Sequence, residues 1–419
     1  MTGRARRDGR VASVVLGVLV TVGTLLGASR PAVAAPGPPS VRAPAAILVE
    51  PATGDVVFQR RAASPRSIAS TTKLMTALVV LERERLGRVV SATRYRALPA
   101  ESVVGLRAGE RLTIADLLRA LLLASANDAA ATLAARVGGS RGRFVALMNR
   151  RARELGLRHT RFANPVGLDE TGNHSTAEDL VKLTLILRAN AFFRRVTDLP
   201  AATLRSGGRP RTVVNRNRLV RTVPEVNGVK TGRTQRAGYV LVGSATRAGV
   251  TVISVVLGDS SEAARDADTL ALLRHGLRRY TRVTALRRGQ TVRQVALAFR
   301  DEPVALTAQR TVRRTIRRGE RVTRRVVGLP TQLDGPLAAG TRVATVELRW
   351  RGRTIERVGL VTARRVEKAG ALARLDPFAG RTLAVLAIAL VALASLRLLL
   401  ARRRAQRRAR RHAGETEVA

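Results

Sequence analysis

Long, mainly apolar stretches lie near both ends of the 419-residue chain, and Arg397 interrupts the second one close to its end. The first apolar stretch, residues 11–29, follows a segment with four arginines and precedes Ala32-Val33-Ala34, a small-x-small cleavage signature. This order is typical of a secretory signal peptide, so we predict a signal peptide at 1–34 and a polar, Pro-rich leader at 35–44. Because the stretch is nearly long enough to span a bilayer, an uncleaved anchor helix is the alternative.

The second apolar stretch covers residues 382–401. Twenty helical residues are about 30 Å long, which matches the hydrocarbon core of a membrane, so we predict a transmembrane helix. Seven arginines follow between Arg402 and Arg411. Positive residues favour the cytoplasmic side, so we expect the tail 402–419 in the cytoplasm and the preceding chain outside the cell. A buried core helix is the alternative for this stretch.

Between these ends the spacing of apolar residues changes from strand-like to helical and back. Residues 45–60 predict two short strands around a turn, and 238–258 predict a hairpin of strongly apolar strands. Helical spacing appears at the following ranges: 67–85, 113–123, 128–136, 141–155, 175–190 and 261–280. Strands joined by a hairpin are antiparallel. We therefore predict that 45–282 is an α+β domain, with helices packed on an antiparallel sheet.

Residues 284–370 alternate apolar residues with Arg or Thr and carry Gly turns. This pattern predicts a small all-β domain with one apolar face and one strongly basic face. The expected fold class is thus an α+β domain, followed by an all-β domain and a C-terminal transmembrane helix.

The formal net charge of +45 restricts the possible partners. Such a charge favours nucleic acid, a membrane surface or an acidic wall polymer, although codon bias in a GC-rich genome would also enrich arginine. The signal peptide and the anchor place most of the chain outside the cell, which argues against nucleic acid. The chain has no cysteine, and its four histidines lack metal-ligand spacing. We therefore expect neither a metal nor another cofactor.

Lysine is rare here, with four lysines among 75 Lys and Arg residues. A buried lysine can lose its proton and act as a base, whereas arginine cannot. Lys73 follows Ser70 by three residues, so a helix would place both side chains on one face. A serine hydroxyl becomes a useful nucleophile when a neighbouring base takes its proton. The pair therefore indicates nucleophilic catalysis of the Ser-Lys type.

Two further motifs follow in a known order. Ser125-Ala126-Asn127 is an S-x-N motif, and Lys230-Thr231-Gly232 is a K-T-G motif before the apolar hairpin. With these three motifs, and with text such as ASTTKLMTAL and GVKTGRTQRAGYVLVGSA, the chain resembles the serine D-alanyl-D-alanine carboxypeptidases, the low-molecular-mass penicillin-binding proteins. The resemblance covers about residues 40–282, and implies a β-lactamase/transpeptidase-like fold. The all-β segment, the signal peptide and the anchor also fit this family.

The resemblance implies a role for each motif residue. Ser70 would be the acylated nucleophile, Lys73 its base, and Ser125 the group that protonates the leaving D-alanine nitrogen. The backbone N–H groups of Ser70 and Arg233 would form the oxyanion hole. At position 233 the family more often has an aromatic residue or His, so this chain departs from the pattern there. The implied substrate-binding residues are Asn127, Lys230, Thr231, Gly232, Arg233 and Arg265.

The expected function is removal of the terminal D-alanine from peptidoglycan stem pentapeptides, with β-lactam antibiotics as acylating ligands. Anionic lipid or wall polymer is a further expected partner of the basic β domain. A β-lactamase shares the three motifs, and would need a carboxylate such as Glu170 to activate the deacylating water. A wall-binding surface protein without enzymatic activity is the remaining alternative.

Overall fold

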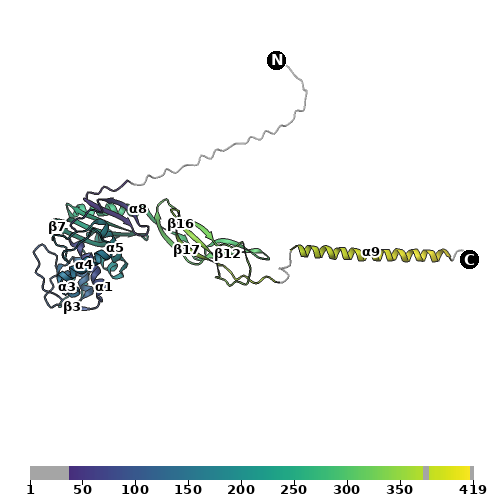
Figure 1. Ribbon diagram of the computed structural model, residues 1–419, viewed down its shortest axis with the longest axis horizontal. Coiled ribbons are helices and arrows are strands. Elements are labelled where there is room, and N and C mark those ends of the chain that lie inside the picture. Colours follow the sequence, from purple (N-terminus) through teal and green to yellow (C-terminus); the bar gives the residue numbers. More distant parts are fainter. Residues whose placement is uncertain (1–36, 371–376, 416–419) are drawn as a thin grey trace, which may run out of the picture. The chain divides into compact units, whose positions relative to one another are not determined.

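The computed structural model of the protein describes residues 37–370 and 377–415 (Figure 1). The predicted signal peptide at 1–34 lies outside the described residues, as do the first two residues of the predicted leader and the last four of the tail. The ranges 45–282 and 284–370 are described in full.

A five-stranded antiparallel sheet forms the centre of the first domain, as the sequence predicted. Its order is β2-β1-β9-β8-β7, so β7 lies at an edge. The N-terminal hairpin pairs through β1 with β9, which joins the two ends of the domain. The strands are β1 (Ala45–Glu50), β2 (Asp55–Arg60), β7 (Val226–Thr234), β8 (Gly238–Arg247) and β9 (Val250–Asp259).

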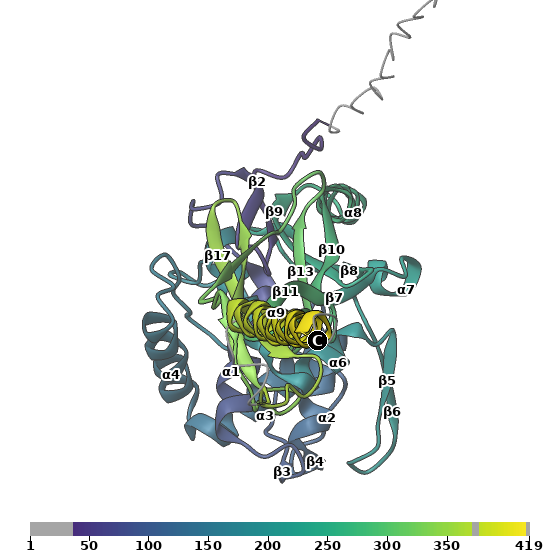
Figure 2. The same ribbon diagram turned by 90° about the vertical axis from the view of Figure 1, so that its right-hand side faces the viewer.

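Both faces of this sheet are covered. Side chains alternate across a strand, and along β8 Val240 and Val242 belong to one hydrophobic core while Leu241 and Ala245 belong to the other. Helix α8 (Glu262–Arg279) covers the second face (Figures 1 and 2). The remaining helices of the domain gather mainly on the first face, where the larger core lies. The Ser70–Lys73 pair and the S-x-N motif adjoin that larger core, because Ala69 and Ala126 are part of it.

The predicted helices of the first domain are present, and two of them differ in form from the prediction. The segment predicted as helix from 67 begins as a 3-10 turn at 69, and the one predicted through 123 becomes a π-helix after Arg119. The short helices α6 and α7 and the hairpins β3–β4 and β5–β6 were not predicted. The elements are η1 (Ala69–Thr72), α1 (Lys73–Arg83), β3 (Val89–Ser91), β4 (Arg111–Thr113), α2 (Ile114–Arg119), η2 (Ala120–Ala124), α3 (Asn127–Gly138), α4 (Arg141–Glu154), α5 (Ala177–Ala189), α6 (Ala191–Asp198), β5 (Ala201–Leu204), β6 (Arg211–Val214) and α7 (Arg218–Thr222).

Residues 280–370 contain strands and no helix. A six-stranded sheet has the order β14-β16-β17-β12-β11-β15, and β10 pairs with β13 in a separate ribbon. Alternate residues of β16, namely Ala344, Val346 and Leu348, enter a core of their own. The strands are β10 (Tyr280–Leu286), β11 (Thr291–Leu297), β12 (Arg300–Ala308), β13 (Val312–Arg317), β14 (Thr323–Val327), β15 (Gln332–Leu333), β16 (Arg342–Trp350) and β17 (Arg353–Thr362).

Helix α9 runs from Pro377 to Glu415 and contains the predicted membrane segment 382–401. Its part from Arg381 to Arg408 has a mean hydropathy of 2.6 in its most apolar window and is exposed along its length. It is therefore long and apolar enough to cross a membrane. The helix extends into the basic tail because Ala, Arg and Gln are all strong helix formers.

Candidate active site

The Ser70–Lys73 pair lies where η1 passes into α1. Ala69 begins the 3-10 turn with a φ of 45°, and Lys73 is the first residue of α1. The Lys73 Nζ donates a hydrogen bond of 3.0 Å to the Ser70 Oγ. Ser70 is half-buried, and Lys73 is completely buried. The predicted contact between an amine and a hydroxyl is therefore present.

The surroundings of Lys73 favour its neutral form. Burial lowers the pKa of Lys73 to about 7, because desolvation disfavours the ammonium ion. The nearby Glu101 opposes this effect, Arg216 adds to it, and Asp128 opposes it. A substantial share of the amine is thus unprotonated at neutral pH and able to accept the proton of Ser70.

A tight loop at 164–170 supplies the second partner of Lys73. The lysine Nζ also donates to the carbonyl of Val166. The Asn164 Oδ1 accepts from three successive backbone N–H groups, the shortest bond being 2.6 Å to Gly167. Gly167 has a φ of 84°, and a Cβ there would lie 2.1 Å from the carbonyl oxygen of Ala69. Only glycine therefore lets this loop lie against η1.

The S-x-N motif forms the turn between η2 and α3. Ser125 takes the left-handed conformation with a φ of 61°, and both Ser125 and Asn127 are buried. The Asn127 backbone N–H donates to the carbonyl of Ser102 at 2.7 Å. Its Nδ2 donates to the Glu101 Oε2 at 2.6 Å. Since Glu101 also acts electrostatically on Lys73, this turn lies close to the Ser70–Lys73 pair.

The K-T-G motif lies on the edge strand β7. Lys230 is buried, and its Nζ donates to the carbonyl of Thr231 at 2.8 Å. Burial lowers the pKa of Lys230 well below its ordinary value, and the charges of Lys73, Arg216 and Arg265 add to the effect. A Cβ on Gly232 would lie 2.8 Å from the Ser70 backbone nitrogen. Strand β7 therefore passes directly beside Ser70, and Gly232 permits this approach.

The two arginines of the predicted site differ in their surroundings. Arg233 is exposed, and its guanidinium stacks over the Tyr239 ring at 5.3 Å. Arg265 is buried in α8 and is paired with Glu262 at 2.9 Å and Asp266 at 2.7 Å. Its positive charge lowers the pKa of Lys230, while its guanidinium already pairs with two acids of its own helix.

Glu170 lies in the 164–170 loop and serves to hold it. Its carboxylate pairs with Arg141 and accepts from the Asn164 Nδ2 at 3.0 Å. The carboxylate that contacts a motif residue is instead Glu101, which sequence analysis did not single out. Glu101 and Asn164 both lie in irregular segments, where no periodicity marks a residue as buried or central.

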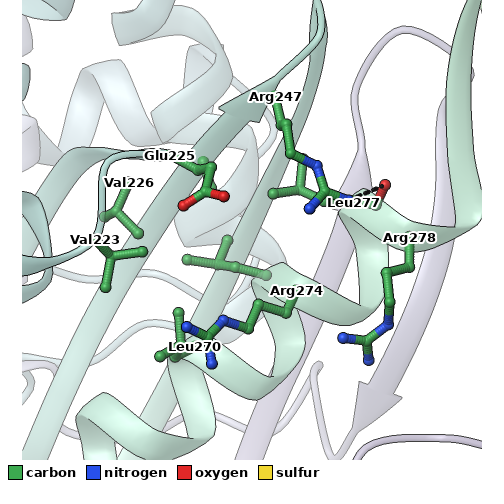
Figure 3. Close-up of a pocket in the computed structure, with 10 residues that line it drawn as sticks. Val223, Glu225, Val226, Arg247, Leu270, Arg274, Leu277 and Arg278 are labelled. Carbon is green, nitrogen blue, oxygen red and sulfur yellow. Dashed lines mark hydrogen bonds between the residues drawn. The ribbon is translucent and has the colours of Figure 1, made fainter.

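Cavities lie both at the site and away from it. One of about 330 Å³ borders the 164–170 loop and is lined by Tyr95, Ala134, Val166 and Leu168 among others. Another of about 280 Å³ lies between α8 and the ends of β7 and β8, where Glu225 and Arg274 line it (Figure 3). That second cavity contains none of the predicted site residues. Among residues 37–370 and 377–415, no three His, Asp or Glu side chains gather closely enough to hold a metal ion.

Comparison with known proteins identifies the family. The family described as D-alanyl-D-alanine carboxypeptidase matches residues 32–261, which is more than half of the chain. This chain belongs to the D-alanyl-D-alanine carboxypeptidase family. DacC of Escherichia coli is 34% identical to this carboxypeptidase-family protein over 364 residues, covering 81% of this chain and 88% of DacC. DacF of Bacillus subtilis is 30% identical over 337 residues, covering 78% and 87% respectively.

A solved structure agrees with this assignment. Penicillin binding protein 5 from Haemophilus influenzae has a TM-score of 0.58 and 27% identity, and covers 80% of this chain and all of its own. The family resemblance and the fold class predicted from the sequence are both confirmed. As a member of this family, the protein is a serine peptidase.

Proposed function

We propose that this protein removes the terminal D-alanine from peptidoglycan stem pentapeptides through an acyl-Ser70 intermediate. The observation that carries the proposal is the buried Lys73 amine, which lies 3.0 Å from the Ser70 hydroxyl and has a pKa of about 7. An amine in this state can take the proton of the hydroxyl during attack on a carbonyl carbon.

The three motifs support the following course of the proposed reaction. The Ser70 Oγ attacks the carbonyl of the penultimate D-alanine while Lys73 takes its proton. The backbone N–H groups of Ser70 and Arg233 stabilise the oxyanion. Ser125 then relays this proton from Lys73 to the nitrogen of the leaving D-alanine as the peptide C–N bond breaks. Water then hydrolyses the Ser70 ester, and the hydroxyl recovers its proton.

The edge strand and its cations suit an extended peptide with a free carboxylate. One side of β7 has no neighbouring strand in its sheet, so a substrate backbone can pair along it. Asn127 would hold the substrate amide. The charge of Lys230 and the hydroxyl of Thr231 would bind the terminal carboxylate beside Gly232. Arg265 would add positive potential from α8.

A β-lactam presents a strained amide and a carboxylate to the same groups, so we propose that penicillin acylates Ser70 as well. The β-lactamase alternative needs a carboxylate free to activate water. Glu170 is engaged by Arg141 and Asn164, which disfavours that role. The alternative of a non-enzymatic wall-binding protein does not explain why a buried lysine contacts the Ser70 hydroxyl.

We further propose that α9 anchors the protein in the cell membrane, with the catalytic domain outside and the basic tail 402–419 in the cytoplasm. The apolar length of the helix and the seven arginines that follow it support this topology. The all-β domain would connect the catalytic domain to the anchor, and its arginine-rich strands would suit contact with anionic lipid or wall polymer.

Peptide mapping by mass spectrometry, after incubation of the full-length protein with penicillin in detergent, tests the proposed function. We expect the adduct on the peptide that contains Ser70, and loss of both the adduct and D-alanine release in Ser70→Ala. Ser67→Ala is the matched control, since Ser67 is half-buried in the same segment and makes no hydrogen bond recorded among the described residues. An adduct on any other serine would contradict the assignment.

A further inference from the structure

The Glu101 carboxylate lies at the centre of a small network beside the S-x-N motif. Its Oε2 accepts from the Asn127 Nδ2 at 2.6 Å and from the Tyr95 hydroxyl. Its Oε1 accepts from the backbone N–H of Leu98 at 3.2 Å. The next residue, Ser102, accepts from the Asn127 backbone N–H at 2.7 Å. The loop between β3 and β4 is thus attached to Asn127 through both side chain and backbone.

This attachment determines how the Asn127 carboxamide is turned. A carboxylate accepts only from the amide nitrogen, so the Nδ2 must face Glu101. The Oδ1 is then directed away from Glu101, where it can accept a hydrogen bond from the substrate amide. Hydrogen bonds to a charged acceptor are stronger than neutral ones, so this orientation is firmly held before substrate arrives.

The charge of Glu101 also matters, because the cleft is rich in cations. The charges of Lys73, Arg216 and Arg265 all lower the pKa of Lys230, and Arg216 also lowers the pKa of Lys73. Asp128 is the second acid near Lys73, and its carboxylate is occupied by backbone N–H groups, among them Leu106 at 3.0 Å. Glu101 is therefore the acid near Lys73 that also contacts a motif side chain.

Building on the proposed function, we propose that Glu101 is a positioning residue of the active site. It orients the Asn127 carboxamide through a direct hydrogen bond, and its negative charge balances the cations gathered around Lys73.

The charge of Glu101 allows a measurement whose result would not change if the residue were purely structural. Lys73 works as a base in its neutral form, so the acylation rate rises as pH passes through the Lys73 pKa. Glu101 raises that pKa, against the effects of burial and Arg216. Removing the negative charge should therefore lower the pKa, and the rising limb of the pH profile should move to lower pH.

The experiment measures acylation of the full-length protein by a fluorescent penicillin between pH 5 and 9. Glu101→Gln retains an acceptor for Asn127 and removes the charge. The pH at which its acylation rate rises should therefore be about one unit lower, and its maximal acylation rate should be nearly unchanged. Glu101→Ala removes both the acceptor and the charge, so it should show the same pH shift and a maximal acylation rate about tenfold lower.

Two further variants serve as controls. Tyr95→Phe keeps the charge of Glu101 and should leave the pH of the rise in rate unchanged. Glu154→Gln, on the exposed end of α4, is the control for loss of one negative charge.

The outcomes separate this inference from the proposed function. If the wild type is acylated at Ser70 but Glu101→Gln has the wild-type pH profile, the role of Glu101 is overturned while the proposed function stands. If the wild type itself is not acylated, both are overturned. Thermal melting of each variant checks folding, and should Glu101→Ala fail to fold, the near-isosteric Glu101→Gln decides the matter.

Discussion

A lysine serves as a base only where its surroundings favour the neutral amine. Lys73 meets this condition because it is fully buried, and its one side-chain partner among the described hydrogen bonds, Ser70, is uncharged. Its second partner is the carbonyl of Val166, which accepts a hydrogen bond from either protonation state. Lys73 is thus held in place by two uncharged hydrogen-bond acceptors, without a directly bonded carboxylate that would favour its protonated form.

Replacement of Lys73 by arginine tests this account at the residue scale. Arginine retains the positive charge but cannot give up a proton at working pH, so acylation by penicillin should fall by about 10²–10⁴-fold. In the wild type the rate should rise with pH through a midpoint near pH 7, because Lys73 titrates at about 7. Lys182→Arg, at a half-exposed position on α5, should keep the wild-type rate and profile. Retention of activity in Lys73→Arg would mean that another group is the base.

Residues close in sequence were the predictable part of the site. Ser70 and Lys73 lie one turn apart, and this spacing alone indicated their contact. Glu101 was not predictable, because it reaches Asn127 from a segment between two short strands without any periodic pattern. Arg265 was placed correctly on a helix, but its pairing with Glu262 and Asp266 depends on side-chain rotamers that a sequence does not reveal.

At the scale of elements, the site depends on how closely β7 passes η1. Adding a Cβ to Gly232 would bring it within 2.8 Å of both the Ser70 nitrogen and Val240. Gly232→Ala should push the strand from the nucleophile, lower the acylation rate about 10²-fold, and cost about 1–3 kcal/mol of stability. The rate and the melting temperature measure these two effects. Gly142→Ala on α4, where no atom lies within 4 Å of the new Cβ, should leave both nearly unchanged.

Unchanged acylation in Gly232→Ala would show that the cleft tolerates displacement of β7. The sequence placed the K-T-G motif just before the apolar hairpin, but it did not indicate how closely this strand passes η1. The same holds for the breaks in two helices, since the helical spacing of 113–123 gives no sign of the π-turn before Ser125. Periodicity locates elements, whereas close approaches between them depend on packing.

At the scale of the whole molecule, Asp55 joins the α+β domain to the all-β domain. It lies at the start of β2 and accepts from the Tyr280 hydroxyl at 2.7 Å. Arg351, in the turn between β16 and β17, donates two hydrogen bonds to it at 2.8 and 3.0 Å. No sequence pattern indicated this contact, because its partners are 225 and 296 residues away.

Asp55→Asn should weaken this connection in a pH-dependent way. Hydrogen bonds from Arg351, opposed by partial burial, lower the pKa of Asp55 below its ordinary 3.8. A lowered pKa means that the carboxylate stabilises the folded protein above about pH 4, and that this contribution is lost as pH falls through the folded-state pKa. Calorimetry at pH 7 should therefore show a melting temperature about 2–4 °C lower in the variant, for a loss of about 1 kcal/mol. The difference should shrink as pH falls below 3.8 and vanish below the lowered folded-state pKa, where wild-type Asp55 is neutral as well. Asp301→Asn, at an exposed position on β12, should melt like the wild type at both pH values, and a pH-independent difference in Asp55→Asn would contradict the ion-pair account.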